Sequence, residues 1–280
     1  MIDMGPLEII LIILGAIAAL ALLLFLIYVL ILVRPGKKVK PSPSLMCEYA
    51  HRGLHGNGVP ENSLQAFELA CGRGCGIELD VQLSKDGEVM VFHDYTLNRV
   101  TGVDKKLCDL DAKELTSIPL KGTDQTIPTF KEVLALVDGR SPILVELKGE
   151  NFDVSLCKKV ADILLEYKGE YCIESFNPLL IKEIRKHLPH AFRGQLYSNI
   201  WRDKNRHSAI NLGISLMAFN FLAKPDFIAY DKVDRKSLPV RLTTKLYRAP
   251  KFVWTAKGQQ EVDTANSLGE CPIFELEEKE

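Results

Sequence analysis

Residues 75–82 read CGIELDVQ, and this stretch organises the rest of the chain. Alternate side chains of a strand point to opposite faces, so Glu78 and Asp80 share one face while apolar residues take the other. Two carboxylates at this spacing repel each other unless a cation lies between them. Because carboxylate oxygens are hard ligands, they suit Mg²⁺ or Ca²⁺ better than zinc. The stretch therefore predicts a strand that carries two ligands of a divalent cation.

A second apolar stretch, PILVELK at residues 142–148, repeats the alternation. Here Glu146 and Lys148 share a face, so the carboxylate could join the cation while the ammonium faces an anion. His51 and His93 also follow short apolar runs. Together these residues form a set that can move protons on both sides of a phosphoester.

The polar residues lie at the ends of expected strands, where a β/α barrel keeps its active site. Amphipathic helices alternate with these strands, which indicates a parallel α/β fold. Asn62 is expected to cap the helix after the first strand. Residues 95–141 are less regular, and we interpret them as an insertion between barrel strands that could cover the site. Further strands are expected near residues 45–50, 88–92, 171–175, 192–196, 216–219, 227–230, 252–255 and 272–274.

The N-terminal part of the chain predicts a membrane anchor. Residues 7–33 are apolar except for Glu8, and about 20 apolar residues suffice to cross a bilayer. We predict a single transmembrane helix there, after a short tail at residues 1–6 and before a basic, proline-rich linker at 34–44. The basic residues nearest the apolar run all follow it: Arg34, Lys37, Lys38 and Lys40.

This charge asymmetry places the domain at residues 45–280 in the cytoplasm of a single-pass cell-membrane protein. A signal anchor with the domain outside is one alternative. A cleaved signal peptide is another, although the run is long and no small-residue cleavage site follows it.

Charge and cysteine content narrow the class of protein. The chain carries 35 Lys and Arg against 36 Asp and Glu, so nothing predicts a nucleic-acid partner. An anionic substrate would have to meet local positive charges. The seven cysteines lack the spacing of a zinc site, and we interpret most of them as small core side chains in a reducing compartment. Nothing in the sequence predicts an oligomeric state.

Eight short motifs carry a resemblance that covers about residues 48–275. They are His51-Arg52-Gly53, Pro60-Glu61-Asn62-Ser63, Glu78-Leu79-Asp80-Val81, His93-Asp94-x-x-Leu97-x-Arg99-x-Thr101, Ile127-Pro128-Thr129-Phe130, Glu146-Leu147-Lys148, Ser175-Phe176 and Val253-Trp254-Thr255. In content and order they resemble the motifs of glycerophosphodiester phosphodiesterases. The resemblance implies a TIM (β/α)8 barrel with a small insertion after the His-Asp motif, matching residues 95–141.

The same resemblance implies an activity and residue roles. The family hydrolyses sn-glycerol-3-phosphate diesters of small alcohols to glycerol 3-phosphate and the free alcohol, with a divalent cation, Mg²⁺ or Ca²⁺. The implied roles are metal binding for Glu78, Asp80 and Glu146, general acid and base catalysis for His51 and His93, and neutralisation of phosphate oxygens for Arg52 and Lys148.

Several alternatives stay open at this point. Trp254 fits a substrate wall and core packing equally well. A lysophospholipase D or sphingomyelinase D of the same barrel type is the first rival, because a membrane anchor makes lipid substrates reachable. A membrane-tethered scaffold without chemistry is the second, although all the ligand and histidine positions are intact. The chain also departs from the family at residues 272–275, where Thr-Asp is common, and in the basic segment 228–250.

Overall fold

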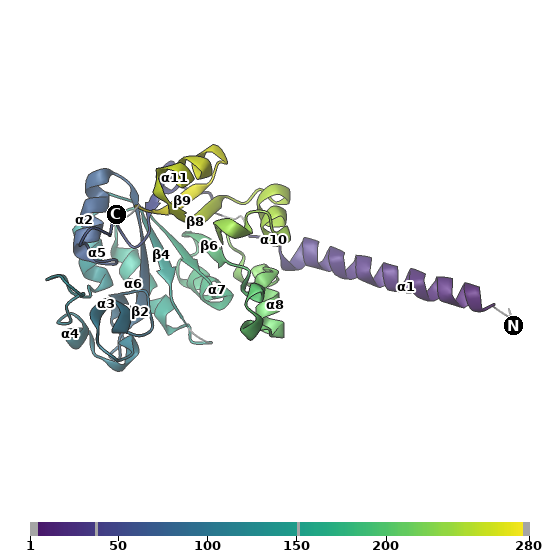
Figure 1. The fold of residues 1–280 in the computed structure, drawn as a ribbon, viewed down its shortest axis with the longest axis horizontal. Helices are drawn as coiled ribbons and strands as arrows, with labels where there is room; N and C mark the ends of the chain where they lie inside the picture. The colour runs from purple at the N-terminus through teal and green to yellow at the C-terminus, as the bar shows by residue number, and fades with distance from the viewer. Residues whose placement is uncertain (1–4, 37–38, 150–151, 277–280) are drawn as a thin grey trace.

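Eight parallel strands close into a barrel in the computed structural model, which describes residues 5–36, 39–149 and 152–276 (Figure 1). The ring closes because β1 pairs with both β2 and β9. The predicted TIM barrel is therefore confirmed. Its strands are β1 (Tyr49–Ala50), β2 (Gly76–Leu83), β4 (Ile143–Leu147), β5 (Tyr171–Ser175), β6 (Phe192–Tyr197), β7 (Phe227–Asp231), β8 (Lys251–Lys257) and β9 (Cys271–Glu275).

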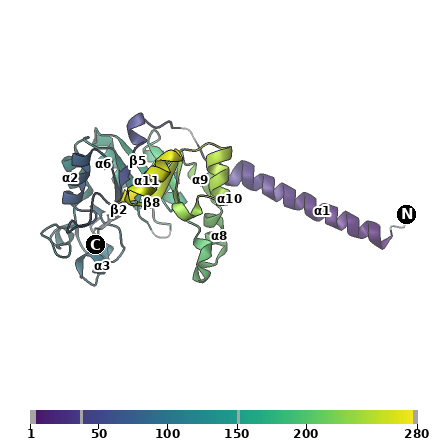
Figure 2. The same cartoon turned by 45° about the horizontal axis from the view of Figure 1, so that its top comes forward.

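Helices cover the outside of the barrel between successive strands (Figure 2). The longer helices present an apolar stripe to the sheet, as α6 does with buried side chains at Cys157, Val160, Ala161 and Leu164. The helices are α2 (Leu64–Arg73), α5 (Phe130–Val137), α6 (Ser155–Glu166), α7 (Pro178–His187), α8 (Ala209–Ser215), α9 (Asn220–Ala223), α10 (Leu238–Arg241) and α11 (Gly258–Ser267).

A small lobe interrupts the barrel after β2. Strand β3 (Val89–Val91) pairs antiparallel with β2, and the chain then forms α3 (Asn98–Thr101), η3 (Leu107–Asp109) and α4 (Ala112–Leu115). The lobe has its own apolar core, whereas α5, which lies inside the predicted insertion, packs into the main core. The buried core of the lobe consists of Met90, Phe92, Leu97, Leu107, Leu110, Leu115, Leu120 and Ile127.

Aromatic rings fill the amino-terminal end of the barrel interior. The ring centroid of Phe227 lies 4.7 Å from that of Phe192 and 4.3 Å from that of Phe252, and Tyr49 lies 5.8 Å from Phe252. Gly194 permits this packing, because a Cβ there would lie 2.1 Å from the Phe227 ring. All four aromatic residues occupy the first or second position of their strands. The rings therefore form a solid floor and leave the opposite end of the barrel to polar side chains.

Helix α1 (Pro6–Ile27) projects from the barrel as a rod (Figure 1). With the adjoining turn η1 (Tyr28–Leu32), it forms a 27-residue helix that is long and apolar enough to cross a membrane. No residue of α1 is buried against the barrel.

The end of this helix is firmly attached to the barrel. Val29 and Val33 are both buried, and Val33 belongs to a cluster that contains residues of β6, β7 and β8. The Tyr28 hydroxyl donates a 3.0 Å hydrogen bond to the Leu216 carbonyl, and the Tyr247 hydroxyl donates one of 2.6 Å to the Val29 carbonyl. The helix therefore leaves the barrel in a fixed direction.

The described residues of the segment predicted as a linker, 34–36 and 39–44, lie against the amino-terminal end of the barrel. The Gly36 N–H donates to the Pro225 carbonyl at 2.8 Å, and the Val39 N–H donates to Asp226 Oδ1 at 3.0 Å. Asp226 is itself buried and forms an ion pair with buried Arg193, with Nη2 and Oδ2 3.3 Å apart. One carboxylate thus joins the linker to the strands of the barrel.

Two local expectations are wrong. Leu216–Phe219 is a turn between α8 and α9, with Met217 at φ 50°, because a short apolar run fits a buried turn as well as a strand. The cap of α2 is Ser63, whose hydroxyl accepts the Ala66 N–H, and Asn62 serves another purpose described below.

The cysteines agree with their interpretation as core side chains. All seven are free, and four of them are buried. Cys108 is exposed, and its place in the lobe after β2 puts it outside the main core. The buried four are Cys75, Cys157, Cys172 and Cys271.

Replacing Asp226 with alanine is expected to destabilise the fold by about 3 kcal/mol or more, because Arg193 would keep a buried charge without its partner. For a domain of this size, that corresponds to a fall of roughly 6–12 °C in Tm. Thermal unfolding of the full chain in detergent measures the effect. Asp162→Ala, which removes the exposed Lys158–Asp162 pair, is the matched control and should shift Tm little. Equal Tm values for the two variants would contradict the assignment.

Candidate active site

Three carboxylates meet at the end of the barrel opposite the aromatic floor. Glu78 and Asp80 lie on β2 and Glu146 on β4, where Asp80 and Glu146 are paired in register. Oxygens of the three side chains lie within 4.8 Å of one another. The residues are 2%, 0% and 7% exposed. The structure therefore brings together the residues that the strand alternation placed on one side.

Their electrostatics differ sharply. Burial raises the pKa of Glu78 well above its usual range, and the charges of Asp80 and Glu146 raise it further. Burial also raises the pKa of Glu146, to about 7. Burial opposes ionisation of Asp80 as well, but nearby cations, above all Lys148, lower its pKa. The cluster thus holds more carboxyl groups than its surroundings can keep ionised.

Lys148 and Arg52, the residues predicted to face phosphate oxygens, both contact this cluster. Lys148 Nζ lies 2.8 Å from Glu146 Oε1 and 3.1 Å from Asp80 Oδ1. The Arg52 backbone N–H donates to Glu78 Oε2 at 2.8 Å, and Arg52 Nε lies 3.6 Å from Asp80 Oδ2. Positive charge is therefore present beside the carboxylates and within reach of an anion bound there.

The turn after β1 requires a special backbone. The first residue after the strand, His51, donates its N–H to the Phe274 carbonyl of β9. Arg52 then adopts a left-handed φ of 56°, and Gly53 follows at 80°. A Cβ at Gly53 would lie 2.8 Å from the Ala66 Cβ, so only glycine lets the turn pack against α2. This geometry points the Arg52 N–H at the carboxylates.

Each candidate histidine is paired with a carboxylate through Nδ1. His51 Nδ1 lies 2.7 Å from Glu275 Oε1, and His93 Nδ1 lies 2.6 Å from Asp94 Oδ1. The hydrogen bond from His51 lowers the pKa of Glu275 to about 2. Burial lowers the pKa of His93. With Nδ1 donating to a carboxylate, Nε2 of each ring is left to exchange a proton with a substrate.

A network of ion pairs joins the two histidine turns. Glu61 accepts from Arg52 Nη1 at 2.9 Å and from Arg99 Nη2 at 2.7 Å. Arg99 Nε also donates to Asp94 Oδ2 at 2.6 Å. The network ties the loop before α2, which begins next to His51, to the lobe after β2, where Asp94 also holds His93.

Two further polar residues complete the cluster. The Asn62 amide donates to Asp80 Oδ2 at 2.9 Å and is buried at a left-handed φ of 53°. Glu174 lies on β5 opposite Glu146 and is 1% exposed. Burial raises its pKa well above the usual range, and the charges of neighbouring carboxylates, first that of Glu78, raise it further. Among the described residues, no hydrogen bond to its buried Oε2 is found.

The mouth of the site has an aromatic wall. A hollow is lined by His93 and Lys148 on one side and by Phe176 on another. Trp254 packs edge-on against Phe176, with ring centroids 5.6 Å apart. Behind Phe176, an apolar cavity is lined by Leu196, Tyr197, Ile214, Met217 and Phe219. Trp254 thus supports the wall through Phe176.

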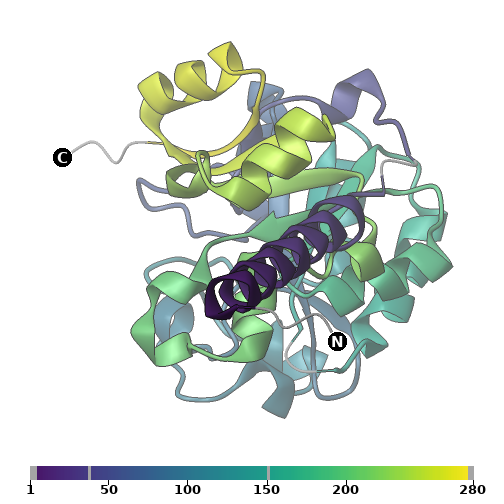
Figure 3. The ribbon, with the colours of Figure 1, turned by 90° about the vertical axis from the view of Figure 1, so that its right-hand side faces the viewer.

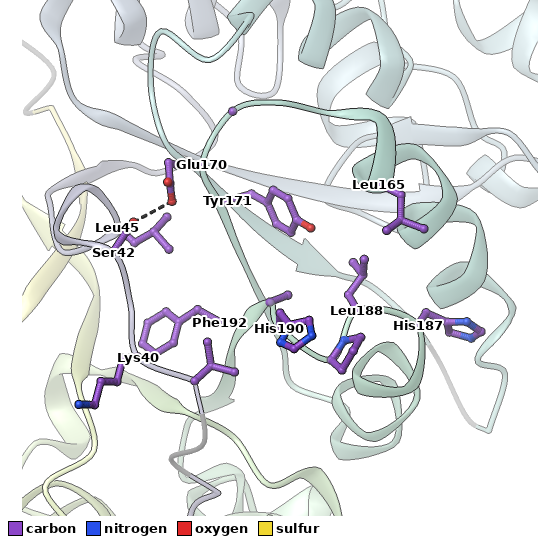
Figure 4. Close-up of a pocket in the computed structure, with 14 residues that line it drawn as sticks. Lys40, Ser42, Leu45, Leu165, Glu170, Tyr171, His187, Leu188, His190 and Phe192 are labelled. Atoms are coloured by element: carbon purple, nitrogen blue, oxygen red, sulfur yellow. Dashed lines mark hydrogen bonds between the residues drawn. The ribbon is translucent and has the colours of Figure 1, made fainter.

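A larger hollow lies at the other end of the barrel (Figure 4). Lys40 from the linker and Leu45 just after it face His187, the last residue of α7, and His190 beyond it across the hollow. Ser42 donates to Glu170 beside it, at 2.7 Å. None of the predicted site residues lines this hollow.

Comparison with models of protein families identifies the family to which the chain belongs. The model of the glycerophosphoryl diester phosphodiesterase family matches residues 51–274, which include the histidine turns and the three carboxylates. The chain belongs to this family. The resemblance carried by the eight motifs is thereby confirmed.

Relatives within the glycerophosphoryl diester phosphodiesterase family match part of the chain. A glycerophosphodiester phosphodiesterase of Caldanaerobacter subterraneus is 35% identical over 53% of this chain and 65% of its own length. One of Bacillus altitudinis is 43% identical over 37% of this chain and 44% of its own length. The chain thus spans less than two thirds of either relative. A lysophospholipase D of Rattus norvegicus is 34% identical over 44% of this chain and 42% of its own length.

Solved structures share the family fold. A glycerophosphodiester phosphodiesterase of Thermotoga maritima superposes with a TM-score of 0.63 at 26% identity, covering 82% of this chain and 94% of the other. An Oleispira antarctica phosphodiesterase, in complex with the product sn-glycerol-3-phosphate, superposes with a TM-score of 0.66 at 22% identity over 82% and 92% of the two chains.

Sequence reasoning missed several residues of this family site. Glu275 falls where the family pattern is broken and at the start of an acidic tail, yet it pairs with His51. The signal for Glu174 was present, because residues 171–175 alternate and Glu174 shares a face with buried Cys172. Asn62 fits a helix cap in the sequence, because its short polar side chain suits a cap as well as a hydrogen bond to Asp80.

A divalent cation is expected to raise the Tm of the full chain, since three crowded buried carboxylates are better satisfied when it is bound. At about 100 times the Kd, the gain is roughly 2.7 kcal/mol. Thermal unfolding with Mg²⁺, Ca²⁺ or a chelator measures it. Glu78→Gln should lose most of the gain, and Glu166→Gln, an exposed change on α6, should keep it. No cation-dependent shift in the unchanged protein would refute a metal site here.

Proposed function

We propose that the chain hydrolyses glycerophosphodiesters to sn-glycerol 3-phosphate and an alcohol. The observation that carries this proposal is the placement of two histidine–carboxylate pairs and two cationic side chains around one buried acidic cluster. Family membership and the product complex of the Oleispira antarctica relative support it.

Positive charge is the first requirement of this reaction, because the oxygens of a phosphodiester repel a nucleophile. Lys148 and Arg52 lie beside the acidic cluster and would hold the phosphate oxygens there. The buried hard-oxygen set of Glu78, Asp80 and Glu146 fits a divalent cation, Mg²⁺ or Ca²⁺. When bound, such a cation would offset charge on the phosphate oxygens.

Proton transfer is the second requirement. One histidine would remove the proton from the attacking water or substrate hydroxyl, and the other would protonate the departing alkoxide. Either assignment fits, since Glu275 and Asp94 hold both rings in the same way, through Nδ1. Each transfer is typically worth about 10²- to 10⁴-fold in rate.

A lysophospholipid substrate is the second candidate. Phe176, which is partly exposed, adjoins the site, and with Trp254 it offers an aromatic surface for an acyl chain. The similarity to a lysophospholipase D of Rattus norvegicus points the same way. In this case the same groups would act on the same phosphodiester bond, with a lipid on the glycerol side.

We also propose that residues 7–33 anchor the chain in a cell membrane, with residues 45–280 as the catalytic domain in the cytoplasm. The helix at Pro6–Leu32 is long and apolar enough to span a bilayer. The basic residues that follow it, Arg34, Lys37, Lys38 and Lys40, favour the cytoplasmic side.

The deciding experiment is hydrolysis by the full chain in nanodiscs, with Glu78→Ala as the blank. The substrates are glycerophosphocholine, glycerophosphoethanolamine, glycerophosphoglycerol and lysophosphatidylcholine, each with Mg²⁺, Ca²⁺ or chelator. Cation-dependent release of glycerol 3-phosphate, absent from the blank, is the expected result. Choline release from the lyso-lipid alone would favour the second candidate. No turnover of any substrate by folded, cation-bound protein would overturn the catalytic proposal.

Glu275→Gln is expected to lower kcat by about 10- to 100-fold with little change in KM, because His51 would lose the carboxylate that orients its ring. Steady-state kinetics on the preferred substrate test this. Glu166→Gln again removes one exposed carboxylate elsewhere and should leave both constants unchanged. If Glu275→Gln retained full kcat, the His51–Glu275 pair would have no part in the reaction.

A further inference from the structure

The length of α1 matches the thickness of a bilayer, so the barrel would lie directly at the membrane surface. Its 22 residues span about 33 Å, which matches the roughly 30 Å hydrocarbon core of a membrane. The next turn, η1, packs against the barrel, because Val29 is buried and the Tyr28 hydroxyl donates a hydrogen bond to the turn after α8. A bilayer spanned by α1 would therefore end where the barrel begins.

Two arms flank the point at which α1 leaves the barrel. Figure 3 looks along α1 and shows it standing out between α8, in green, and the yellow-green segment that contains α10. Hydrogen bonds confirm both contacts, from Tyr28 to Leu216 beside α8 and from Tyr247 to Val29 after α10. A bilayer that surrounds the base of α1 would therefore contact both arms.

The first arm consists of α10 and η7 (Leu242–Leu246) and is both basic and apolar on its open side. Leu238 and Leu246 are exposed, and Arg241 and Lys245 lie beside them at helical spacing. Arg248 follows, also exposed. Residues 238–248 contain no Asp or Glu, so nothing within the arm offsets these three charges.

The second arm runs from η4 (Ile200–Arg202) through α8. Every residue from 201 to 210 is exposed, among them Trp201 and Ile210. Trp201 stacks on His207 with ring centroids 4.2 Å apart, which holds the indole on the surface. Lys204 and Arg206 are exposed around it, against a single acid, Asp203. Arg202 ties the arm to the barrel through Asp234.

We propose that these two arms, residues 200–215 and 238–248, rest in the headgroup layer of an anionic lipid bilayer. Exposed basic side chains beside exposed aromatic and aliphatic ones match the charge and the amphipathic character of that layer. Tryptophan favours the same depth, with its ring among the acyl chains and its N–H toward water. This occupant also explains the basic residues at 238–248, which the reaction does not use.

The placement orients the active site. The second arm follows the carboxyl-terminal end of β6, at the end of the barrel that carries the acidic cluster. Ile214 and Met217, at the end of this arm and just beyond it, line the apolar cavity behind Phe176. The second arm therefore reaches from the proposed bilayer surface to the residues that pack behind the wall of the site.

Fluorescence quenching tests the proposal on the full chain in nanodiscs that carry a spin label on the lipid headgroup. Trp201 and Trp254 are the only tryptophans of the sequence, so a Trp201→Phe variant isolates the Trp201 signal by difference. In discs that contain phosphatidylglycerol, Trp201 should be quenched strongly. The triple variant Arg241→Gln, Lys245→Gln, Arg248→Gln should lower that quenching by at least about twofold, as should high salt.

The matched control is Lys105→Gln, Lys106→Gln, Lys113→Gln, which removes three exposed charges from the lobe after β2 and should leave quenching unchanged. Quenching of Trp201 no greater than that of Trp254 would overturn the proposal. So would equal quenching in the two triple variants. The inference rests on anchoring by α1 and not on the reaction, and co-elution of the chain with the discs tests that anchoring separately.

Discussion

Mutual repulsion among buried carboxylates governs the design of this site. Glu78, Asp80, Glu146 and Glu174 share the carboxyl-terminal end of the barrel, and a low-dielectric interior cannot keep so many groups ionised without positive partners. Several neighbours that enter the cluster accordingly present a hydrogen or a cation. The Lys148 ammonium, the Arg52 backbone N–H and the Asn62 amide all do so. The carboxylate cluster therefore favours positive charge. An anionic ester can bind next to the cluster only where such positive charge is present.

The barrel makes this concentration of charge tolerable by separating its two ends. Four aromatic residues close the amino-terminal end, so the apolar packing inside the barrel lies apart from the polar end. The carboxylates sit on strands, where the backbone is rigid, while the histidines sit on turns and are fixed by carboxylates of their own. The backbone of the strands thus fixes the carboxylates, whereas ion pairs fix the histidines.

The sequence predicted what depends on local periodicity. Alternation along residues 75–82 placed Glu78 and Asp80 together, and the ends of apolar runs located His51 and His93. What it could not predict depends on contacts between distant segments. Glu275 lies 224 positions from its partner His51, and no local pattern joins them. Asn62 satisfied a capping pattern that Ser63 fulfils in fact. The apolar length of α1 was plain, whereas its attachment through Tyr28 and Val33 follows only from the folded barrel.

The pairing of His51 with Glu275 has a consequence for the life of the molecule. His51 directly follows the first strand of the ring and Glu275 ends the last, and they meet because β9 completes the barrel beside β1. During translation His51 emerges early, but its carboxylate partner is made only when the ribosome reaches the end of β9. The histidine therefore stays without that partner in every partial chain. The site therefore becomes complete only when β9 pairs with β1 and closes the ring.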